Sequence, residues 1–144
     1  MRRAFLWINF VLASLIALLV FLQAYLITAY VTGAGEGALD AHGFVGGLLI
    51  HGFELLVFLT AFGAWPRQWK WIAFTFFLFV FGTVQIFLSP GDDPASGWVH
   101  GLHGLFALFV MLLAAYIAYR GAQDLGLRRA RAEPAGGDMP PPPP

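Results

Sequence analysis

Four long apolar segments dominate this chain, at about residues 4–31, 41–64, 71–88 and 98–120. Each is near or above the roughly 20 residues that a helix needs to cross a lipid bilayer. The chain is 59% hydrophobic and 11% charged, whereas about a quarter of the residues of a soluble domain are charged. We therefore expect an all-α fold, a four-span transmembrane helical bundle that forms one domain over residues 1–120.

The charges predict how this bundle lies in its membrane. Basic residues occur only at the N-terminus, in the turn at 65–70 and at or after the end of the fourth span: Arg2, Arg3, Arg67, Lys70, Arg120, Arg128, Arg129 and Arg131. The other two connections carry Glu36, Asp40, Asp92 and Asp93 instead. The positive-inside rule places both termini and the 65–70 turn in the cytoplasm. Residues 121–144, basic at first and then proline-rich, are predicted to be a disordered cytoplasmic tail.

Composition also limits the cofactors and partners. The chain has no cysteine, which excludes disulfides, iron–sulfur clusters, thiolate zinc sites and covalently attached c-type haem. Its formal net charge is zero, and we expect the lipid bilayer as its partner and no nucleic acid.

A short motif begins both the second and the fourth span. It reads His42-Gly-x-x-Gly46 in the first copy and His100-Gly-x-x-Gly104 in the second. On a helix, residues four apart lie on one face, so each imidazole has a bare glycine one turn deeper. An imidazole beside a side-chain-free patch suits a flat metal ligand such as porphyrin. The alternative is packing, because small residues let helices approach closely.

Further polar residues are predicted at the same depth. Each motif follows a Gln-x-aromatic-Leu segment, which begins at Gln23 in the first half and at Gln85 in the second. The chain therefore reads as two similar hairpins, related by a pseudo-two-fold axis that would bring both motifs to one site. His103 lies about 4.5 Å deeper than His100 and some 60° round the helix. Imidazoles and amides without thiolates suit haem iron, copper or zinc.

His51 and Glu54 form a separate pair in the second span. His51 follows His42 by nine residues, so a regular helix places it on the opposite face and about 13.5 Å deeper. We therefore expect it not to share the site of His42. Glu54 is one turn further and close enough to bond His51. We expect its carboxyl to be neutral, because an ionised group there would be strongly desolvated. The pair is a candidate proton or quinone site, or else a bond that fastens two helices.

The pattern resembles a family of small bacterial membrane proteins of unknown function, with four spans and His-x-x-x-Gly at the start of the second and fourth. The likeness covers roughly residues 10 to 120 and is carried by Gln23, His42, Gly46, Gln85, His100 and Gly104. It implies a four-helix fold in the bacterial cytoplasmic membrane and no particular reaction. His51 and His103 are additions to the shared pattern. The architecture is also similar to that of membrane cytochromes b.

The leading hypothesis is a membrane protein that binds haem b and passes electrons between a quinone or membrane partner and the outer face. His42 and His100 would be the axial ligands, and Gly46 and Gly104 would clear space for the ring. The remaining members of the site would surround it: Gln23, Gln85 and His103. The alternatives are a non-catalytic membrane subunit or assembly factor, and a small copper or zinc carrier that uses the same histidines. The sequence assigns no catalytic residue.

Overall fold

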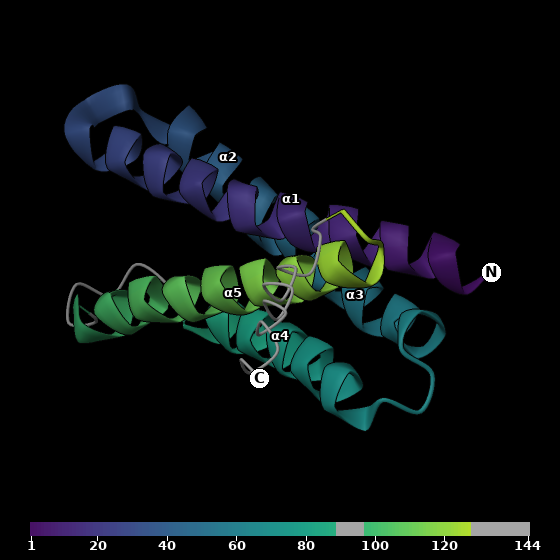
Figure 1. Cartoon of the computed structure of the whole chain (residues 1–144). Helices are drawn as coiled ribbons and strands as arrows, with labels where there is room; N and C mark the ends of the chain where they lie inside the picture. The colour runs from purple at the N-terminus through teal and green to yellow at the C-terminus, as the bar shows by residue number, and fades with distance from the viewer. Residues whose placement is uncertain (89–96, 128–144) are drawn as a thin grey trace, which may run out of the picture.

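The structure is a computed structural model that describes residues 1–88 and 97–127 of the chain. These residues form helices and no strand (Figure 1). In chain order the elements are α1 (Arg2–Ala29), the π-helix η1 (Tyr30–Ala34), α2 (Glu36–Phe44), the π-helix η2 (Val45–Ile50), α3 (His51–Ala64), α4 (Trp69–Phe87) and α5 (Gly97–Asp124).

The helices form a four-membered bundle built from two antiparallel hairpins. Helix α1 packs against α3 and α5, and α4 packs against the same two neighbours. Four continuous helical stretches are long and apolar enough to cross a membrane: Arg2–Ala34, Glu36–Ala64, Trp69–Phe87 and Gly97–Asp124. Large apolar side chains such as Leu18 and Phe21 lie on the outside of the bundle, with 63% and 64% of their surface exposed. The predicted all-α, four-helix fold is confirmed.

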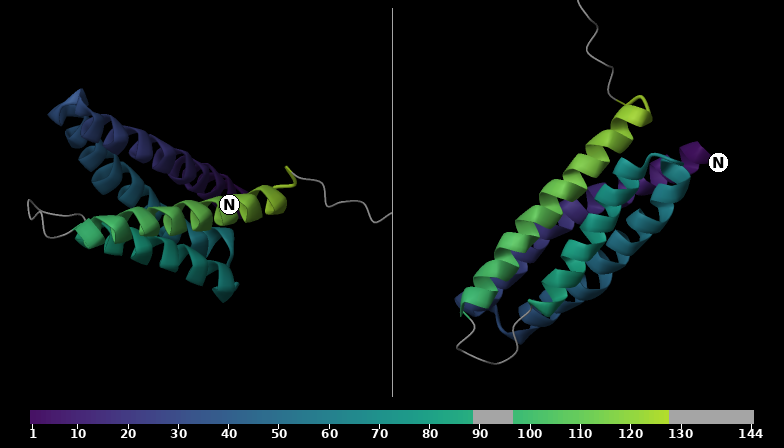
Figure 2. Two further views of the ribbon diagram at one scale, coloured as in Figure 1. Left: turned by 90° about the vertical axis from the view of Figure 1, so that its left-hand side faces the viewer. Right: turned by 90° about the horizontal axis from the view of Figure 1, so that it is seen from below.

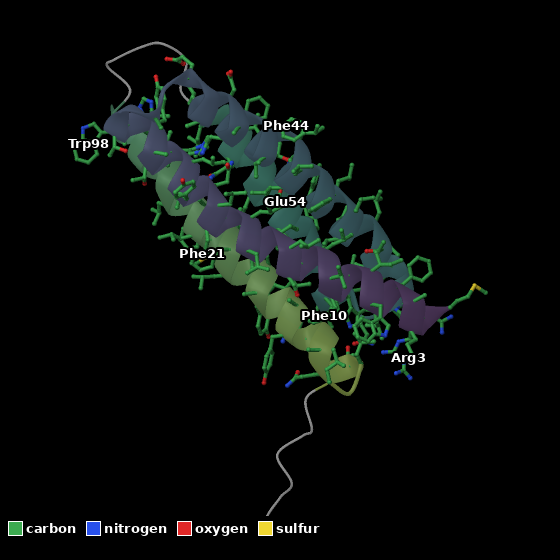
Figure 3. All side chains as sticks on the ribbon, turned by 90° about the horizontal axis from the view of Figure 1, so that it is seen from above. Arg3, Phe10, Phe21, Phe44, Glu54 and Trp98 are labelled. Carbon is green, nitrogen blue, oxygen red and sulfur yellow. The ribbon has the colours of Figure 1, made fainter. Side chains whose placement is uncertain are left out.

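The two ends of the bundle differ in charge and in packing. We call one the basic end, because it holds Arg2, Arg3, Arg67, Lys70 and Arg120. The other, the acidic end, holds Glu36 and Asp40 at the start of the second helical stretch. In Figure 1 and in the left view of Figure 2 the two hairpins diverge toward the acidic end. Figure 3 shows Arg3 and Trp98 at opposite ends of the molecule.

The seam where α1 packs against α5 lies in the basic half of the bundle. Helix α1 buries residues at alternating spacings of three and four, which places them on one face: Leu6, Asn9, Ala13, Ile16 and Val20. The facing seam of α5 continues the pattern with Val110, Ala114, Ile117 and Gly121. A Cβ at Gly121 would lie 3.1 Å from the Phe10 Cβ, so a small residue is needed where α1 and α5 cross. The seam ends at Val20 and Val110, and beyond them the hairpins separate.

The first connection is tighter than the sequence indicates. Residues 32–40 read as a glycine-rich loop, but α2 already begins at Glu36. Gly33 and Gly35 make the whole reversal, with φ angles of 100° and 87° that side chains rarely adopt. Two permissive residues are enough to turn the chain, so Asp40 lies on a helix.

Helix α5 is longer than the expected span, which ends at residue 120. It continues to Asp124 because that carboxylate is held in place by two partners. The Trp65 indole Nε1 donates to Asp124 Oδ2 at 2.7 Å. Arg120 donates to the same oxygen at 3.1 Å, one turn earlier on the helix. The remainder of the predicted tail, residues 128–144, and the connection at 89–96 with Asp92 and Asp93 lie outside the described residues.

Candidate functional site

A cavity of about 430 Å³ lies between the two hairpins, on the side of the acidic end. Its floor is the top of the packed core, where Val20, Ile50, Gly82 and Val110 all line it. Most of the wall is apolar or glycine, and the polar lining residues are few: Gln23, His42, His51, Glu54, Gln85 and His103. The cavity therefore gathers six of the polar residues that the sequence singles out. His100 is not among them.

Reciprocal hydrogen bonds link Gln23 on α1 to His42 on α2. The Gln23 side-chain amide Nε2 donates to the His42 carbonyl oxygen at 3.0 Å. In return, His42 Nδ1 donates to the Gln23 carbonyl oxygen at 3.2 Å. A carbonyl only accepts, so Nδ1 carries the proton, and Nε2 of the neutral ring keeps its lone pair.

The second hairpin repeats this arrangement with His103. Its Nδ1 donates to the Gln85 carbonyl oxygen at 3.0 Å. His103 therefore has the same tautomer as His42 and likewise keeps a basic Nε2. A backbone carbonyl that fixes Nδ1–H is the usual support of an imidazole that binds a metal through Nε2.

The structure places His103 beside His42. The ring centroids of His42 and His103 are 6.2 Å apart, and their planes cross at 48°. His100 is exposed near the start of α5 and lies outside the cavity lining. The ring contact that the structure shows for His42 is therefore with His103, and the pairing of His42 with His100 stays a prediction. The equivalent residues of the two hairpins are defined by the contact with glutamine: His42 follows Gln23 by 19 residues and His103 follows Gln85 by 18.

The two motif glycines have different surroundings. Gly104 lines the cavity, and a Cβ built on it would meet no atom within 4 Å. A Cβ on Gly46 would collide with the Gln23 amide nitrogen. Gly46 therefore makes room for the amide that supports His42, whereas Gly104 leaves open space next to His103.

His51 reaches the same cavity as His42 because of the π-helix between them. In η2 the hydrogen bonds run from i to i+5, so each residue turns the chain by less than the 100° of an α-helix. Because the rotation per residue is smaller in η2, the faces of α3 are turned relative to those of α2. His51 therefore lines the same cavity as His42. The expectation that the two histidines point to opposite sides assumed an unbroken α-helix and is corrected here.

Glu54 lies at the floor of the cavity and is fully buried (Figure 3). One hydrogen bond joins its Oε2 to His51 Nδ1 at 3.1 Å. Its other oxygen, Oε1, has no hydrogen-bond partner among the described residues. A Cβ on Gly82 of α4 would collide with the carboxyl group. The one described hydrogen bond of the Glu54 side chain stays within α3, so it does not fasten two helices together.

Comparison with known protein families, curated proteins and solved structures gave no match. The likeness to the uncharacterised four-helix family therefore stays a prediction. Within residues 1–88 and 97–127 there is also no group of three or more His, Cys, Asp or Glu residues that could hold a metal ion. Of the three imidazoles in the cavity lining, His42 and His103 form the pair whose ring centroids lie 6.2 Å apart, and this pair defines the candidate site.

Proposed function

We propose that the chain is a membrane protein that binds haem b, with His42 and His103 as the axial ligands. The observation that carries this proposal is the pair itself. Two imidazoles from opposite hairpins lie 6.2 Å apart, and each is held by its Nδ1–H on a backbone carbonyl. With an iron–nitrogen bond of about 2 Å on each side, two imidazoles on one iron have their ring centres about 6 Å apart.

The number of ligands favours haem over a bare ion. Copper and zinc sites in proteins use three or four protein ligands, whereas the described residues bring together no such group. Haem supplies four equatorial nitrogens of its own and needs only two axial imidazoles. The glycines fit this reading, because Gly43, Gly47 and Gly104 line the cavity and have open space where a side chain would begin.

The biological role we propose is electron transfer in the bacterial cytoplasmic membrane. When bound, haem b supplies one-electron redox chemistry, and the chain supplies its two ligands and an apolar cavity. With the basic end in the cytoplasm, the His42–His103 pair lies in the outer half of the bilayer. Electrons would pass between a quinone or another membrane partner and the outer face.

An absorption spectrum of the full-length protein, purified in detergent, tests this proposal. We expect a reduced spectrum of the b type, with the bands of two axial histidines. A protein that carries copper or zinc at an equimolar level instead would support a metal carrier. A preparation with neither haem nor metal, even after incubation with haemin, would leave the histidines as packing residues of a membrane subunit.

A further inference from the structure

A second polar site lies in the cavity, away from the imidazole pair. Glu54 follows His42 by twelve residues along the second helical stretch, about three turns further from the acidic end. Glu54 and His51 form the floor, while His42 and His103 lie toward the acidic end. The two polar ends therefore leave room for separate hydrogen-bonding partners.

The floor site has an unused hydrogen-bonding atom. Glu54 is completely buried, and its Oε1 has no partner among the described residues although the residue lines the cavity. A buried carboxyl oxygen without a partner is costly, so such atoms are rare in folded proteins unless a ligand or an ordered water completes them. His51 accounts for Oε2 only.

The lining restricts what this ligand can be. Among the described residues that line the cavity there is no Lys or Arg, so an anionic head group would find no counter-charge. The rest of the lining is largely apolar and includes Val20, Ile50 and Val110, and Gly82 of α4 lies directly against the carboxyl. A neutral, largely apolar ligand with one polar group at its tip therefore suits this lining.

Glu54 and His51 also restrict which polar group the ligand can carry at its tip. With its proton on Oε1, a neutral carboxyl donates from Oε1 and accepts His51 Nδ1–H on Oε2. With the proton on Oε2, it donates to Nδ1 of the other neutral tautomer of His51, and Oε1 can accept. Such a group matches a ligand that changes between a carbonyl and a hydroxyl. The His51 ring stacks on Phe79 with the ring centroids 5.0 Å apart, and this contact holds the imidazole from outside the cavity lining.

We propose that the floor of the cavity binds the ring carbonyl of a quinone, or the hydroxyl of the corresponding hydroquinone, at Glu54 Oε1. His51 is a positioning residue that fixes the other carboxyl oxygen. The assignment to a redox-active ring rests on the proposed haem function, whereas the hydrogen-bonding site itself does not.

Menadione (2-methyl-1,4-naphthoquinone) is a suitable probe. Its binding to the full-length protein in detergent would be measured by calorimetry, with empty micelles as the reference. We expect Glu54→Leu to weaken binding about tenfold, because the loss of a single buried hydrogen bond has about that effect. Glu54→Gln should stay within about threefold of the wild type, because the amide can donate to the same carbonyl. Glu36→Leu is the matched control on exposed α2 and should bind as the wild type does.

Gly82→Ala provides a second variant in case Glu54→Leu does not fold. Its added methyl group collides with the Glu54 carboxyl and should displace it, which would also weaken binding about tenfold. Unchanged menadione affinity in Glu54→Leu or Gly82→Ala would overturn the proposal, and so would an equal loss in Glu36→Leu.

The haem spectrum of the same preparations separates the two proposals. Binding that depends on Glu54 in a protein without haem would overturn the haem site and leave the floor site standing. A haem spectrum together with menadione binding that does not depend on Glu54 would overturn the floor site alone.

Discussion

Gln23 and His42 hold each other by two hydrogen bonds, one in each direction, at 3.0 and 3.2 Å. The amide of one residue reaches the backbone of the other, so the orientation of the imidazole is tied to the packing of α1 on α2. His103 has the equivalent ring-to-carbonyl bond on Gln85 at 3.0 Å. The acceptor of each Nδ1–H is thus a backbone carbonyl. A side-chain substitution cannot remove this acceptor, but it can remove the imidazole itself.

The first prediction separates His103 from His100. We expect His42→Ala and His103→Ala each to lose the bis-histidine absorption spectrum, because each removes one axial ligand. His100→Ala is the matched control, since His100 lies on the same helix but outside the cavity lining. Loss of the spectrum in His100→Ala, with retention in His103→Ala, would restore the pairing that the repeat motif alone predicts.

The second prediction concerns the two motif glycines. Gly46→Ala should destabilise the protein by about 1 kcal/mol, because its Cβ displaces the Gln23 amide that supports His42. Gly104→Ala meets open space and should be neutral. The larger Gly104→Leu should fill the cavity and abolish haem binding while the protein still inserts into membranes. Thermal unfolding and the haem-to-protein ratio measure both effects. Equal stability of the two alanine variants would contradict the different surroundings of these glycines.

The third prediction tests the core. Asn9 is fully buried on α1 and donates through Nδ2 to the Val57 carbonyl at 2.7 Å and to Thr60 Oγ1 at 3.0 Å, both on α3. We expect Asn9→Ala to lower the free energy of unfolding by about 1–2 kcal/mol. Ser14→Ala is the control, because the Ser14 hydroxyl bonds only within α1, to Phe10. A similar loss in both variants would mean that the bonds between helices add nothing.

The fourth prediction concerns the end of α5. Asp124→Ala removes the acceptor of the Trp65 indole and the partner of Arg120, whose Nη2 lies 3.0 Å from Asp124 Oδ1. We expect faster amide hydrogen exchange over residues 121–127 and little change in the cavity. Asp40→Ala, an exposed carboxylate at the other end, should leave this exchange unchanged. Unaltered exchange in Asp124→Ala would show that helix propensity alone extends α5.

The fifth prediction links the two ends of the cavity. Glu54→Gln should leave the haem spectrum unchanged, because Glu54 lies about twelve residues from the nearest proposed ligand along its helix. It should slow reduction of the haem by a hydroquinone, since an amide cannot take up the hydroxyl proton. Stopped-flow absorbance measures this rate. A shifted haem spectrum in Glu54→Gln would place the haem at the floor, which contradicts the proposed arrangement.

Much of the fold could be predicted because hydropathy reports helix length directly. The four apolar segments correspond to the four helical stretches. The predicted turn begins after Ala64 as expected, but it is shorter than 65–70, because α4 already begins at Trp69. The observed helix ends differ from the predicted ones where local contacts or glycines determine the end of a helix. The bonds of Asp124 extend α5, and the two positive-φ glycines shorten the first loop.

The site could be predicted only in part, because the motif is local and the contact is not. The His-Gly-x-x-Gly repeat pairs His42 with His100, although His100 follows Gln85 by only 15 residues. The distance from glutamine to histidine is a better guide, since it measures the path up one helix and down the next. By that measure His103, 18 residues after Gln85, is the equivalent of His42 at 19.

The position of His51 had no clear sequence signal. Whether a segment such as Val45–Ile50 forms a π-helix depends on how it packs against α1, so a 100° periodicity is the natural assumption and gives the wrong face. The two adjacent glycines, Gly46 and Gly47, are the local feature that accompanies the change in winding.

The π-helix has a mechanical consequence for anything that occupies the cavity. Residues 42 and 54 belong to one continuous helical stretch, and the winding of η2 sets the angle between them. A ligand bonded to His42 fixes the helix on one side of η2, and a ligand bonded to Glu54 fixes it on the other side. With both ligands bound, the rotation of α2 relative to α3 is fixed. Binding at Glu54 would therefore change the orientation of the His42 imidazole through the winding of η2.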